Sequence, residues 1–317
     1  MTQPSAAPFA ILLAGPTASG KSALALALAE RFGGTIINAD SMQLYRELRV
    51  LTARPTAEEE ARVPHRLYGV RPAAEAASVA WWREQALAAM AEASLPILCG
   101  GTGLYFAALT EGLSAIPPVP PAAREEARAL LAEFGAPALH ARLDAETAAT
   151  LRPGDSQRIA RAYEVLRGTG RGLAEWQREA AHTGPAPWRF AALRLDPPRE
   201  ALRAAIAARF DAMLEAGALE EVRGLVAQGL DPALPAMRAH GVPELAAYLA
   251  GRMPLAAARE RAVLNTGQYT KRQATWFRHH LLAAVPDTHI IHARIEGNAQ
   301  FQESRIAEIL AFIEQRR

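Results

Sequence analysis

The stretch GPTASGKS, from Gly15 to Ser22, decides the fold. It matches the P-loop pattern G-x-x-x-x-G-K-[ST], and it lies between the apolar run FAILLA and an alanine-rich helical pattern. In such a loop, backbone N–H groups turn inward on a phosphate at the N-terminus of the following helix, where the helix dipole favours an anion. The stretch therefore predicts a strand, a loop, a helix and a phosphate-bearing ligand, and a glycine-rich turn without a ligand is the alternative.

Two side chains of this loop carry specific chemistry. Lys21 is expected to reach the terminal phosphate, and Ser22 is expected to supply a hydroxyl group to Mg²⁺. Lys21 and Lys271 are the only lysines among 35 basic residues, and all the others are arginine. The retained lysine suggests a site in which a compact ammonium fits and a planar guanidinium does not.

The ligand depends on the carboxylate that accompanies the loop. A P-loop ATPase needs a Walker B acid at the end of an apolar strand, and the best candidate is Asp40, at the end of TIINAD. Ser-Met-Gln follows it, and the chain has no other apolar run ending in Asp-Glu. From the residues alone Asp40 has three possible roles: a carboxylate on the magnesium side, an N-cap for the following segment, or a general base that faces the phosphate loop.

A second glycine turn, from Gly100 to Gly103, follows the apolar run LPILC. In a parallel sheet it would lie beside the first loop, where the Thr102 hydroxyl could donate to a leaving phosphate oxygen. A plain turn between a strand and a helix is the alternative.

Composition limits the remaining classes of protein. The chain has 317 residues, 50% of them hydrophobic, and a net charge of +2, which is enough for a full core without cross-links. The single cysteine, Cys99, excludes an internal disulfide framework and a cysteine-rich metal site, and it fits a reducing cytoplasm. No apolar stretch approaches the ~20 residues of a membrane span. We therefore expect a cytoplasmic protein with no signal peptide and no membrane partner.

Strand-like runs alternate with helical patterns along the chain, which predicts a parallel α/β sheet. The segment IPPVPP, at 116–121, cannot continue a helix or a central strand, and helical patterns alone follow it until the strand-like run at Trp188–Leu195. We predict a P-loop NTPase-like core formed by residues 1–115 and 188–317, with a helical C-terminal part. Residues 116–187 are expected to form a helical insertion domain.

Two patches suggest RNA. In the insertion, Ile159, Ala162, Tyr163 and Leu166 lie on one apolar helix face, with Asp155 as N-cap, and Gln157, Arg158 and Arg161 lie off it. Near the C-terminus, basic, amide and aromatic side chains alternate in QYTKRQATWFR, from Gln268 to Arg278. Such mixtures suit stacking on unpaired bases and contacts with phosphates, whereas a solvated helix face and core packing of Trp276 and Phe277 are the alternatives.

Taken together, the blocks of sequence resemble one family. In order they are GPTASGKS, NADSMQLYREL, TARPT, PHRLYGV, GGTGLYFAALTEGL, DSQRIARAYEV and QYTKRQATWFR, and they extend over nearly the whole chain. The chain resembles the bacterial tRNA dimethylallyltransferase family. Adenylate isopentenyltransferases share the first blocks, but the insertion with DSQRIAR resembles the tRNA-modifying branch, and a P-loop small-molecule kinase is the other alternative.

The resemblance implies transfer of a dimethylallyl group from dimethylallyl diphosphate to N6 of the adenosine 3′ of the anticodon, position 37. It implies that Asp40 is the general base, that Thr102 donates to the bridging oxygen, and that Lys21 and Arg209 bind the diphosphate. Mg²⁺ near Ser22 would neutralise charge on the leaving group. The implied diphosphate cradle consists of Gly15, Pro16, Thr17, Ala18, Ser19, Gly20, Lys21 and Ser22.

The resemblance also implies contacts with the anticodon stem-loop of tRNA by a monomeric protein. The residues implied are Asp40, Ser41, Met42, Gln43, Thr102, Arg124, Gln157, Arg158, Ile159, Ala160, Arg161 and Arg238. One block departs from the family pattern: where Gly-Tyr and a basic residue are usual, RAHGVPEL has Val242 and Pro243. Proline lacks a backbone N–H and valine cannot stack on a base.

Overall fold

The computed structural model describes residues 7–179, 183–295 and 303–317. The chain forms two compact units. The first comprises residues 1–110 and 185–317, and the second comprises Glu111–Gly184. The helical unit thus begins a few residues before the expected position 116, and it ends at Gly184 where 187 was expected.

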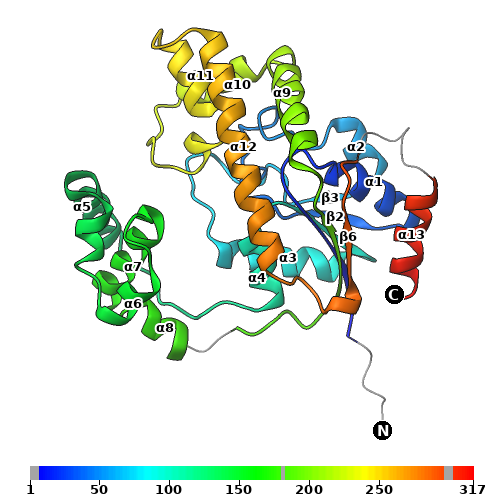
Figure 1. The fold of residues 1–317 in the computed structure, drawn as a ribbon, viewed down its shortest axis with the longest axis horizontal. Helices are drawn as coiled ribbons and strands as arrows, with labels where there is room; N and C mark the ends of the chain where they lie inside the picture. Colours follow the sequence, from blue (N-terminus) through cyan, green and yellow to red (C-terminus); the bar gives the residue numbers. More distant parts are fainter. Residues whose placement is uncertain (1–6, 180–182, 296–302) are drawn as a thin grey trace. The chain divides into compact units, whose positions relative to one another are not determined.

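The larger unit is built on a sheet of six parallel strands (Figure 1). Its order is β3-β2-β4-β1-β5-β6, so the P-loop strand β1 lies inside the sheet, between β4 and β5. This arrangement confirms the predicted parallel α/β class. The strands are β1 (Phe9–Ala14), β2 (Thr35–Asn38), β3 (His65–Arg66), β4 (Pro96–Gly100), β5 (Arg189–Leu195) and β6 (Thr288–Ile291).

Helices cover both faces of this sheet, which explains why its strands read as continuous apolar runs. Ile11 and Leu13 of β1 face α1 (Lys21–Phe32) and α13 (Glu303–Glu314). Leu12, between them, belongs to the opposite core, with α3 (Val79–Glu92), α4 (Gly103–Thr110) and the end of α12 (Leu255–His279). The stacked rings of Trp82 and Tyr105 fill that second layer, with centroids 4.1 Å apart.

A third core holds the helical C-terminal part of the same unit. It joins α9 (Arg199–Glu215), α10 (Ala218–Val226), η1 (Ala236–Arg238) and α11 (Val242–Leu249) to the first half of α12. Ala258 and Ala262 of α12 pack there, whereas Phe277 near its other end packs against the sheet. One straight element therefore connects the helical part with the sheet. Short helices α2 (Ala57–Arg62) and η2 (Val285–Asp287) complete the unit.

The secondary-structure elements that the structure describes in the smaller unit are all helices, apart from a single bridge residue at Ser114. They are α5 (Pro121–His140), α6 (Ala145–Thr150), α7 (Ser156–Thr169) and α8 (Leu173–Glu179). Asp155 caps α7 by accepting a hydrogen bond from the Arg158 backbone N–H. Ile159, Ala162 and Tyr163 are buried along α7, so the predicted apolar face forms the core of this unit.

The fold includes no bilayer-spanning element in the part that the structure describes: none of its helices combines sufficient length with sufficient apolar character.

Candidate active site

The loops after β1, β2 and β4 meet at the carboxyl edge of the sheet, where they line a cavity of about 450 Å³. Helix α9 closes another side through Arg209. The cavity brings together most of the side chains that the sequence singled out. These are Thr17, Ala18, Gly20, Lys21, Ser22, Asp40, Met42, Gln43 and Arg209.

The P-loop has the left-handed backbone that its glycines predict. Gly20 has φ 91°, and a Cβ there would collide with the carbonyl group of Ile295, so only glycine fits. Ala18 adopts φ 64°, which is uncommon for a residue with a side chain. Gly15, Pro16 and Ser19 do not line the cavity, and Ser19 is fully buried. Their contact with a diphosphate stays a prediction.

Lys21 projects from the first turn of α1 into the cavity, and its Nζ donates to the Pro16 carbonyl oxygen at 2.7 Å. Burial lowers the pKa of Lys21 from 10.5 to about 8. Cys99 and the Asp40 carboxylate oppose this shift, and Arg209 adds to it. The ammonium is held in poorly solvated surroundings, so a bound anion would strengthen its charged form.

Asp40 follows β2 in a turn that its own side chain stabilises. One carboxylate oxygen, Oδ1, accepts the Met42 backbone N–H at 2.9 Å. Asn38 fixes the same turn by accepting the Asp40 N–H and donating to the Asp40 carbonyl oxygen. Among the described residues, none donates a hydrogen bond to Asp40 Oδ2. Asp40 therefore begins a turn, not a helix, and presents an oriented carboxylate to the cavity.

Thr102 holds the Asp40 loop in place. Its Oγ1 accepts the Ser41 backbone N–H at 3.0 Å, and its own backbone N–H donates to the Ala39 carbonyl oxygen. Thr102 and Ser41 do not line the cavity, whereas Cys99 and Gly100 of the preceding strand do. The Thr102 side chain also forms a hydrogen bond with Tyr269 of α12. The second glycine turn is thus more than a plain turn between strand and helix.

Gln273 of α12 is a site residue whose position the sequence did not predict. It is 4% exposed. Its Oε1 accepts the Thr17 backbone N–H and its Nε2 donates to the Gly101 carbonyl oxygen, both at 2.9 Å. One amide therefore ties the P-loop to the second glycine turn. Glycine is required in that turn because a Cβ at Gly101 would collide with Gln273, and one at Gly103 with the Trp276 ring.

The cavity is positively charged. Burial lowers the pKa of Arg209. The Asp40 carboxylate opposes this lowering, and the Arg294 charge adds to it. Two strands lie beside the P-loop strand. No acid ends β4, and Asp196, which follows β5, lies near Arg278 and does not line the cavity, whereas Asp40 follows β2, the strand beyond β4. The arrangement suits a polyanion beside one oriented carboxylate. The charged lining consists of Lys21, Arg54, Arg209 and Arg294 against Asp40 and Glu59.

Of the predicted tRNA contacts in the smaller unit, some side chains are exposed and others are buried. Arg124, Gln157, Arg158 and Arg161 are exposed, although Arg158 lies near Asp155 and Arg161 near Glu164. Ile159 requires a correction, because it is 0% exposed and packs inside the unit's own core. Its side chain cannot contact tRNA. Ala160 is half-buried against the same core.

In the divergent block, Arg238 is exposed at η1, and His240 lines the cavity. The His240 ring lies 4.6 Å from that of Tyr269. Val242 is fully buried at the start of α11, and Pro243 occupies its first turn, where no N–H is needed. The departure from the family pattern is thus compatible with the start of α11.

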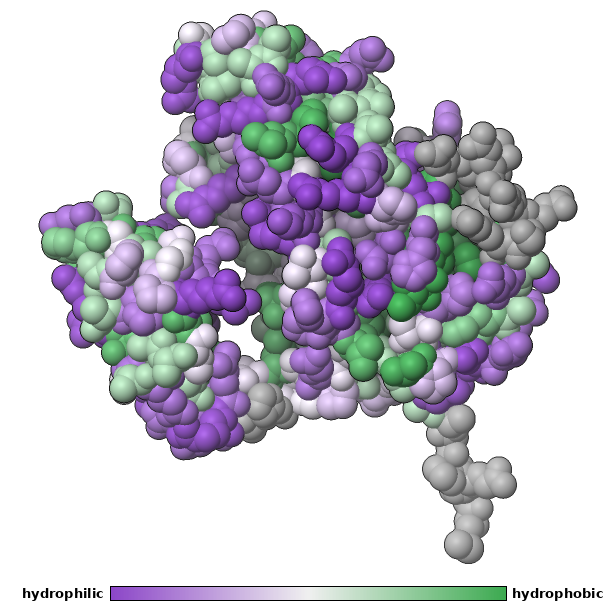
Figure 2. All heavy atoms as spheres, in the orientation of Figure 1, coloured by the Kyte–Doolittle hydropathy of each residue, from purple (hydrophilic) through white to green (hydrophobic). Residues whose placement is uncertain are grey.

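The side chains of the segment from Gln268 to Arg278 are likewise partly buried and partly exposed. Phe277 is 1% exposed and belongs to the sheet core, which is the core-packing alternative and not base stacking. Trp276 is half-buried and stacks on His280 with ring centroids 4.0 Å apart. Lys271, Arg272 and Arg278 are exposed, and Figure 2 shows mostly hydrophilic side chains along α12 on this face of the molecule.

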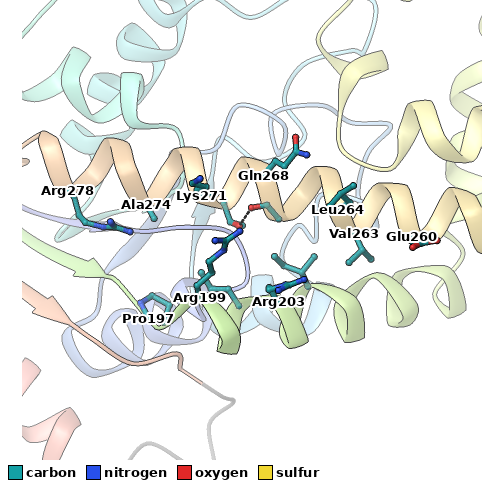
Figure 3. A pocket seen from close by; sticks show the side chains of 14 residues that line it. Pro197, Arg199, Arg203, Glu260, Val263, Leu264, Gln268, Lys271, Ala274 and Arg278 are labelled. Atoms are coloured by element: carbon teal, nitrogen blue, oxygen red, sulfur yellow. Dashed lines mark hydrogen bonds between the residues drawn. The ribbon is translucent and has the colours of Figure 1, made fainter.

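A groove between α9 and α12 encloses a second cavity of about 620 Å³ (Figure 3). Its floor includes Ile206, which also lines the first cavity. Arg199 reaches from α9 toward α12, and Arg203 and Lys271 line the same groove. None of these three side chains forms an ion pair with a residue that the structure describes. The groove is a second basic surface next to the P-loop site.

Comparison with known proteins identifies the family. The model of the IPP transferase family matches residues 43–280. The chain belongs to this family. The model of the isopentenyl transferase family matches residues 9–72, which hold the first blocks of the sequence.

Full-length relatives support the assignment to the IPP transferase family. A tRNA dimethylallyltransferase of Granulibacter bethesdensis is 60% identical over 311 residues, which cover 96% of this chain and 97% of that protein. The crystal structure of a tRNA isopentenylpyrophosphate transferase from Bacillus halodurans aligns with a TM-score of 0.68 at 31% identity, covering 97% and 96% of the two chains. A eukaryotic dimethylallyltransferase acting on tRNA aligns with a TM-score of 0.77 at 25% identity, covering 97% and 80%.

Proposed function

We propose that this enzyme transfers a dimethylallyl group from dimethylallyl diphosphate to N6 of the adenosine 3′ of the anticodon, position 37, in tRNA. One observation carries the proposal. The P-loop and the oriented carboxylate of Asp40 line one cavity, and neither strand beside the P-loop strand adds an acid to it: β4 ends in Gly100, and Asp196, which follows β5, does not line the cavity. A cavity of about 450 Å³ has room for a small donor. The names of the relatives agree with this chemistry.

The reaction is a direct displacement. The adenine N6 attacks the first carbon of the donor, an N–C bond forms, and the C–O bond to the diphosphate breaks with its electron pair leaving on oxygen. Asp40 accepts the proton that N6 loses, through the carboxylate that the Met42 N–H orients. Lys21 and Arg209 stabilise the charge that develops on the diphosphate. Thr102 is the predicted donor to the bridging oxygen. Its hydroxyl donates to Ser41 Oγ at 3.3 Å and does not line the cavity, so this role requires the hydroxyl to turn toward the bound donor.

Mg²⁺ is the metal that this donor set fits. Ser22 is exposed in the first turn of α1, and its hydroxyl and the Asp40 carboxylate line the same cavity. Within the described residues, His, Cys, Asp and Glu nowhere gather in a group of three or more that could cage a metal. Such a sparse set suits Mg²⁺, which is commonly held by substrate phosphates and one or two protein oxygens. When bound, the ion would neutralise negative charge on the leaving diphosphate.

The tRNA is bound through its anticodon stem-loop, with the target base out of the stack and in the cavity. Asp40, Met42 and Gln43 line the cavity and are the contacts nearest to the base, although the Gln43 amide is already bonded to the Thr52 and Ala53 carbonyl oxygens. Ser41 lies beside them. Thr102 does not line the cavity and holds the Asp40 loop from outside it. Exposed side chains of the smaller unit and of α12 bind phosphates. We propose that the protein acts in the cytoplasm and that it acts as a monomer. Light scattering of the protein–tRNA mixture would test the monomeric state.

The decisive assay incubates the protein with dimethylallyl diphosphate, Mg²⁺ and an unmodified tRNA, followed by mass spectrometry of the nucleosides of the anticodon loop. We expect one adenosine, at position 37, to carry a dimethylallyl group in place of one hydrogen. A parallel reaction with ATP tests the small-molecule kinase alternative, and one with AMP as acceptor tests the adenylate isopentenyltransferase alternative. Phosphoryl transfer without prenylation, or prenylation of AMP alone, would contradict the proposal.

Asp40→Asn separates chemistry from folding. Asparagine keeps an oxygen to accept the Met42 N–H, so the turn is retained, but it cannot take a proton. We expect kcat to fall by about 10²–10⁴ while the Kd for tRNA stays within roughly twofold. Turnover equal to that of the unmodified protein would remove Asp40 as the base.

A further inference from the structure

His240 lies on a short segment before α11 that its neighbours hold in place. Ala239 and Val242, on either side of it, are buried. The Glu244 carboxylate, which is also buried, accepts the Gly241 backbone N–H at 3.2 Å. The backbone at His240 is therefore fixed, and its half-buried side chain lines the wall of the active-site cavity.

The imidazole ring of His240 has unused hydrogen-bonding capacity. It packs against the ring of Tyr269, tilted by 47° with centroids 4.6 Å apart, and neither of its nitrogen atoms forms a hydrogen bond with a residue that the structure describes. The other polar side chains on this wall already have partners. The Tyr269 hydroxyl is hydrogen-bonded to the side chains of Thr102 and Gln273, and the Thr266 hydroxyl donates to a carbonyl oxygen of its own helix at 2.8 Å.

The surroundings of His240 favour its neutral form. Burial lowers the pKa of the imidazole, Glu244 and Asp40 oppose this shift, and Arg272 adds to it. A neutral imidazole has one N–H donor and one acceptor nitrogen. The Asp40 carboxylate acts on both His240 and Tyr269, so the two rings and the general base share one end of the cavity. A donor without a partner at this place suits an uncharged acceptor on the ligand.

We propose that His240 reads the target adenine, by donating a hydrogen bond to the ring nitrogen N1 or N7 beside N6 while Asp40 takes the N6 proton. This role rests on the proposed function. Adenine carries an acceptor nitrogen on each side of its amino group, and proteins that bind a flipped-out base read such edges by hydrogen bonds. Val242 cannot stack on a base and is buried, so the divergent block presents His240 to the cavity in its place.

The test removes one atom from the RNA and one donor from the protein. Three synthetic anticodon stem-loops carry adenosine, 1-deazaadenosine or 7-deazaadenosine at the target position, so that a C–H group replaces N1 or N7. His240→Phe keeps a ring against Tyr269 and removes the N–H. His280→Phe is the matched control, because His280 stacks on Trp276 and does not line the cavity. We would measure kcat/KM for each stem-loop at saturating dimethylallyl diphosphate.

We expect His240→Phe to lower kcat/KM for the adenosine stem-loop by about tenfold, which is the effect of one hydrogen bond between uncharged groups. One of the two deaza bases should cause a loss that is about tenfold larger in the parent protein than in His240→Phe, because the variant has no donor for the missing nitrogen. This comparison cancels the change that the missing nitrogen makes to the reactivity of N6. His280→Phe should behave as the parent with all three stem-loops.

Two results would overturn the proposal. In the first, kcat/KM of His240→Phe for the adenosine stem-loop stays within twofold of the parent. In the second, His240→Phe lowers kcat/KM by the same factor for all three stem-loops, as a merely structural role would. If the phenylalanine variant does not fold, His240→Ala takes its place in the same comparison.

The outcome for His240 is separable from that for prenyl transfer. Normal prenylation by His240→Phe would overturn this inference and leave the proposed function intact. If the parent protein prenylates none of the stem-loops, the proposed function fails. The Kd values of the same three stem-loops, measured by fluorescence anisotropy, then decide the inference through the same comparison of parent and variant.

Discussion

Titration of Lys21 gives the sharpest test of the donor site. Burial lowers the pKa of this ammonium from 10.5 to about 8 in the ligand-free protein, so it loses its proton within an accessible pH range. A diphosphate binds the charged form, and kcat/KM reports the ionisation of the free enzyme. At saturating tRNA, kcat/KM for dimethylallyl diphosphate should be level up to about pH 7.5 and should fall roughly tenfold between pH 8 and pH 9.5.

The direction in which the pKa of Lys21 is shifted decides whether ligand binding takes up or releases a proton. The folded, ligand-free protein has a Lys21 pKa of about 8, and the diphosphate raises it again by adding negative charge. Binding between about pH 8 and pH 10 must therefore take up a proton, approaching one per ligand near pH 9. Calorimetry of pyrophosphate binding in two buffers with different ionisation enthalpies measures that uptake directly.

Neighbouring groups do not titrate in the same way. Burial raises the pKa of Cys99 to about 11 and that of Tyr269 further, whereas burial lowers the pKa of His240 below 6.5. Lys21→Arg is the control for the shape of the pH profile alone. A guanidinium stays charged throughout the range, although it fits this site less well and is expected to lower the absolute kcat/KM. A level profile from pH 7.5 to pH 9.5 in the parent protein would refute the reasoning. A decline that Lys21→Arg shares would assign the ionisation to another group.

Two further predictions concern stability and tRNA binding. Gln273→Leu removes the buried amide that joins Thr17 to Gly101, leaving a donor and an acceptor unsatisfied, so urea denaturation should show a loss of about 2–4 kcal/mol; a change below about 0.5 kcal/mol would mean that water replaces the amide. The double variant Arg199→Ala, Arg203→Ala should weaken tRNA binding and reduce the slope of log K against log salt by about one per lost phosphate contact. The single variant Arg158→Ala should have the same kind of effect on both quantities. Arg178→Ala, which removes a side chain paired with Glu146 and Glu179, should leave the slope unchanged; equal slopes in all variants would exclude these surfaces.

The fold was predictable because its signals are local. The P-loop pattern and the apolar runs that became strands both lie within short windows of sequence. The two-residue strand β3 was not predicted, because its pairing with β2 depends on neighbours and not on its own residues. The insertion was recognised from IPPVPP and the helical patterns that follow it.

The site was predictable only in part, and distance along the chain explains why. Lys21, Ser22, Asp40 and Arg209 meet in one cavity as expected, and their catalytic roles stay predictions. Gln273 contacts a residue 256 positions away, so no local pattern could reveal its bridge between two loops.

Burial decides which members of a motif can reach a ligand. Phe277 lies among basic and aromatic residues in the sequence, yet the phase of α12 turns it into the core, which is one of the two alternatives that the sequence allowed. Ile159 belongs to a motif that resembles a tRNA contact, yet it lies on the apolar face of α7. A motif identifies a segment, whereas the side of the helix decides which of its members reach a ligand.

The segment at Arg294 and Ile295 has a consequence for the order in which the enzyme is made. A ribosome delivers the P-loop more than 270 residues before the segment that is hydrogen-bonded to Ala18 and Ser19. β5 and β6 also follow the P-loop by a long stretch of chain, although β5 pairs directly with the P-loop strand. A nascent chain therefore lacks one of the two neighbours of β1 until β5 has emerged, and its phosphate loop takes its final form only after Arg294 and Ile295 have been made.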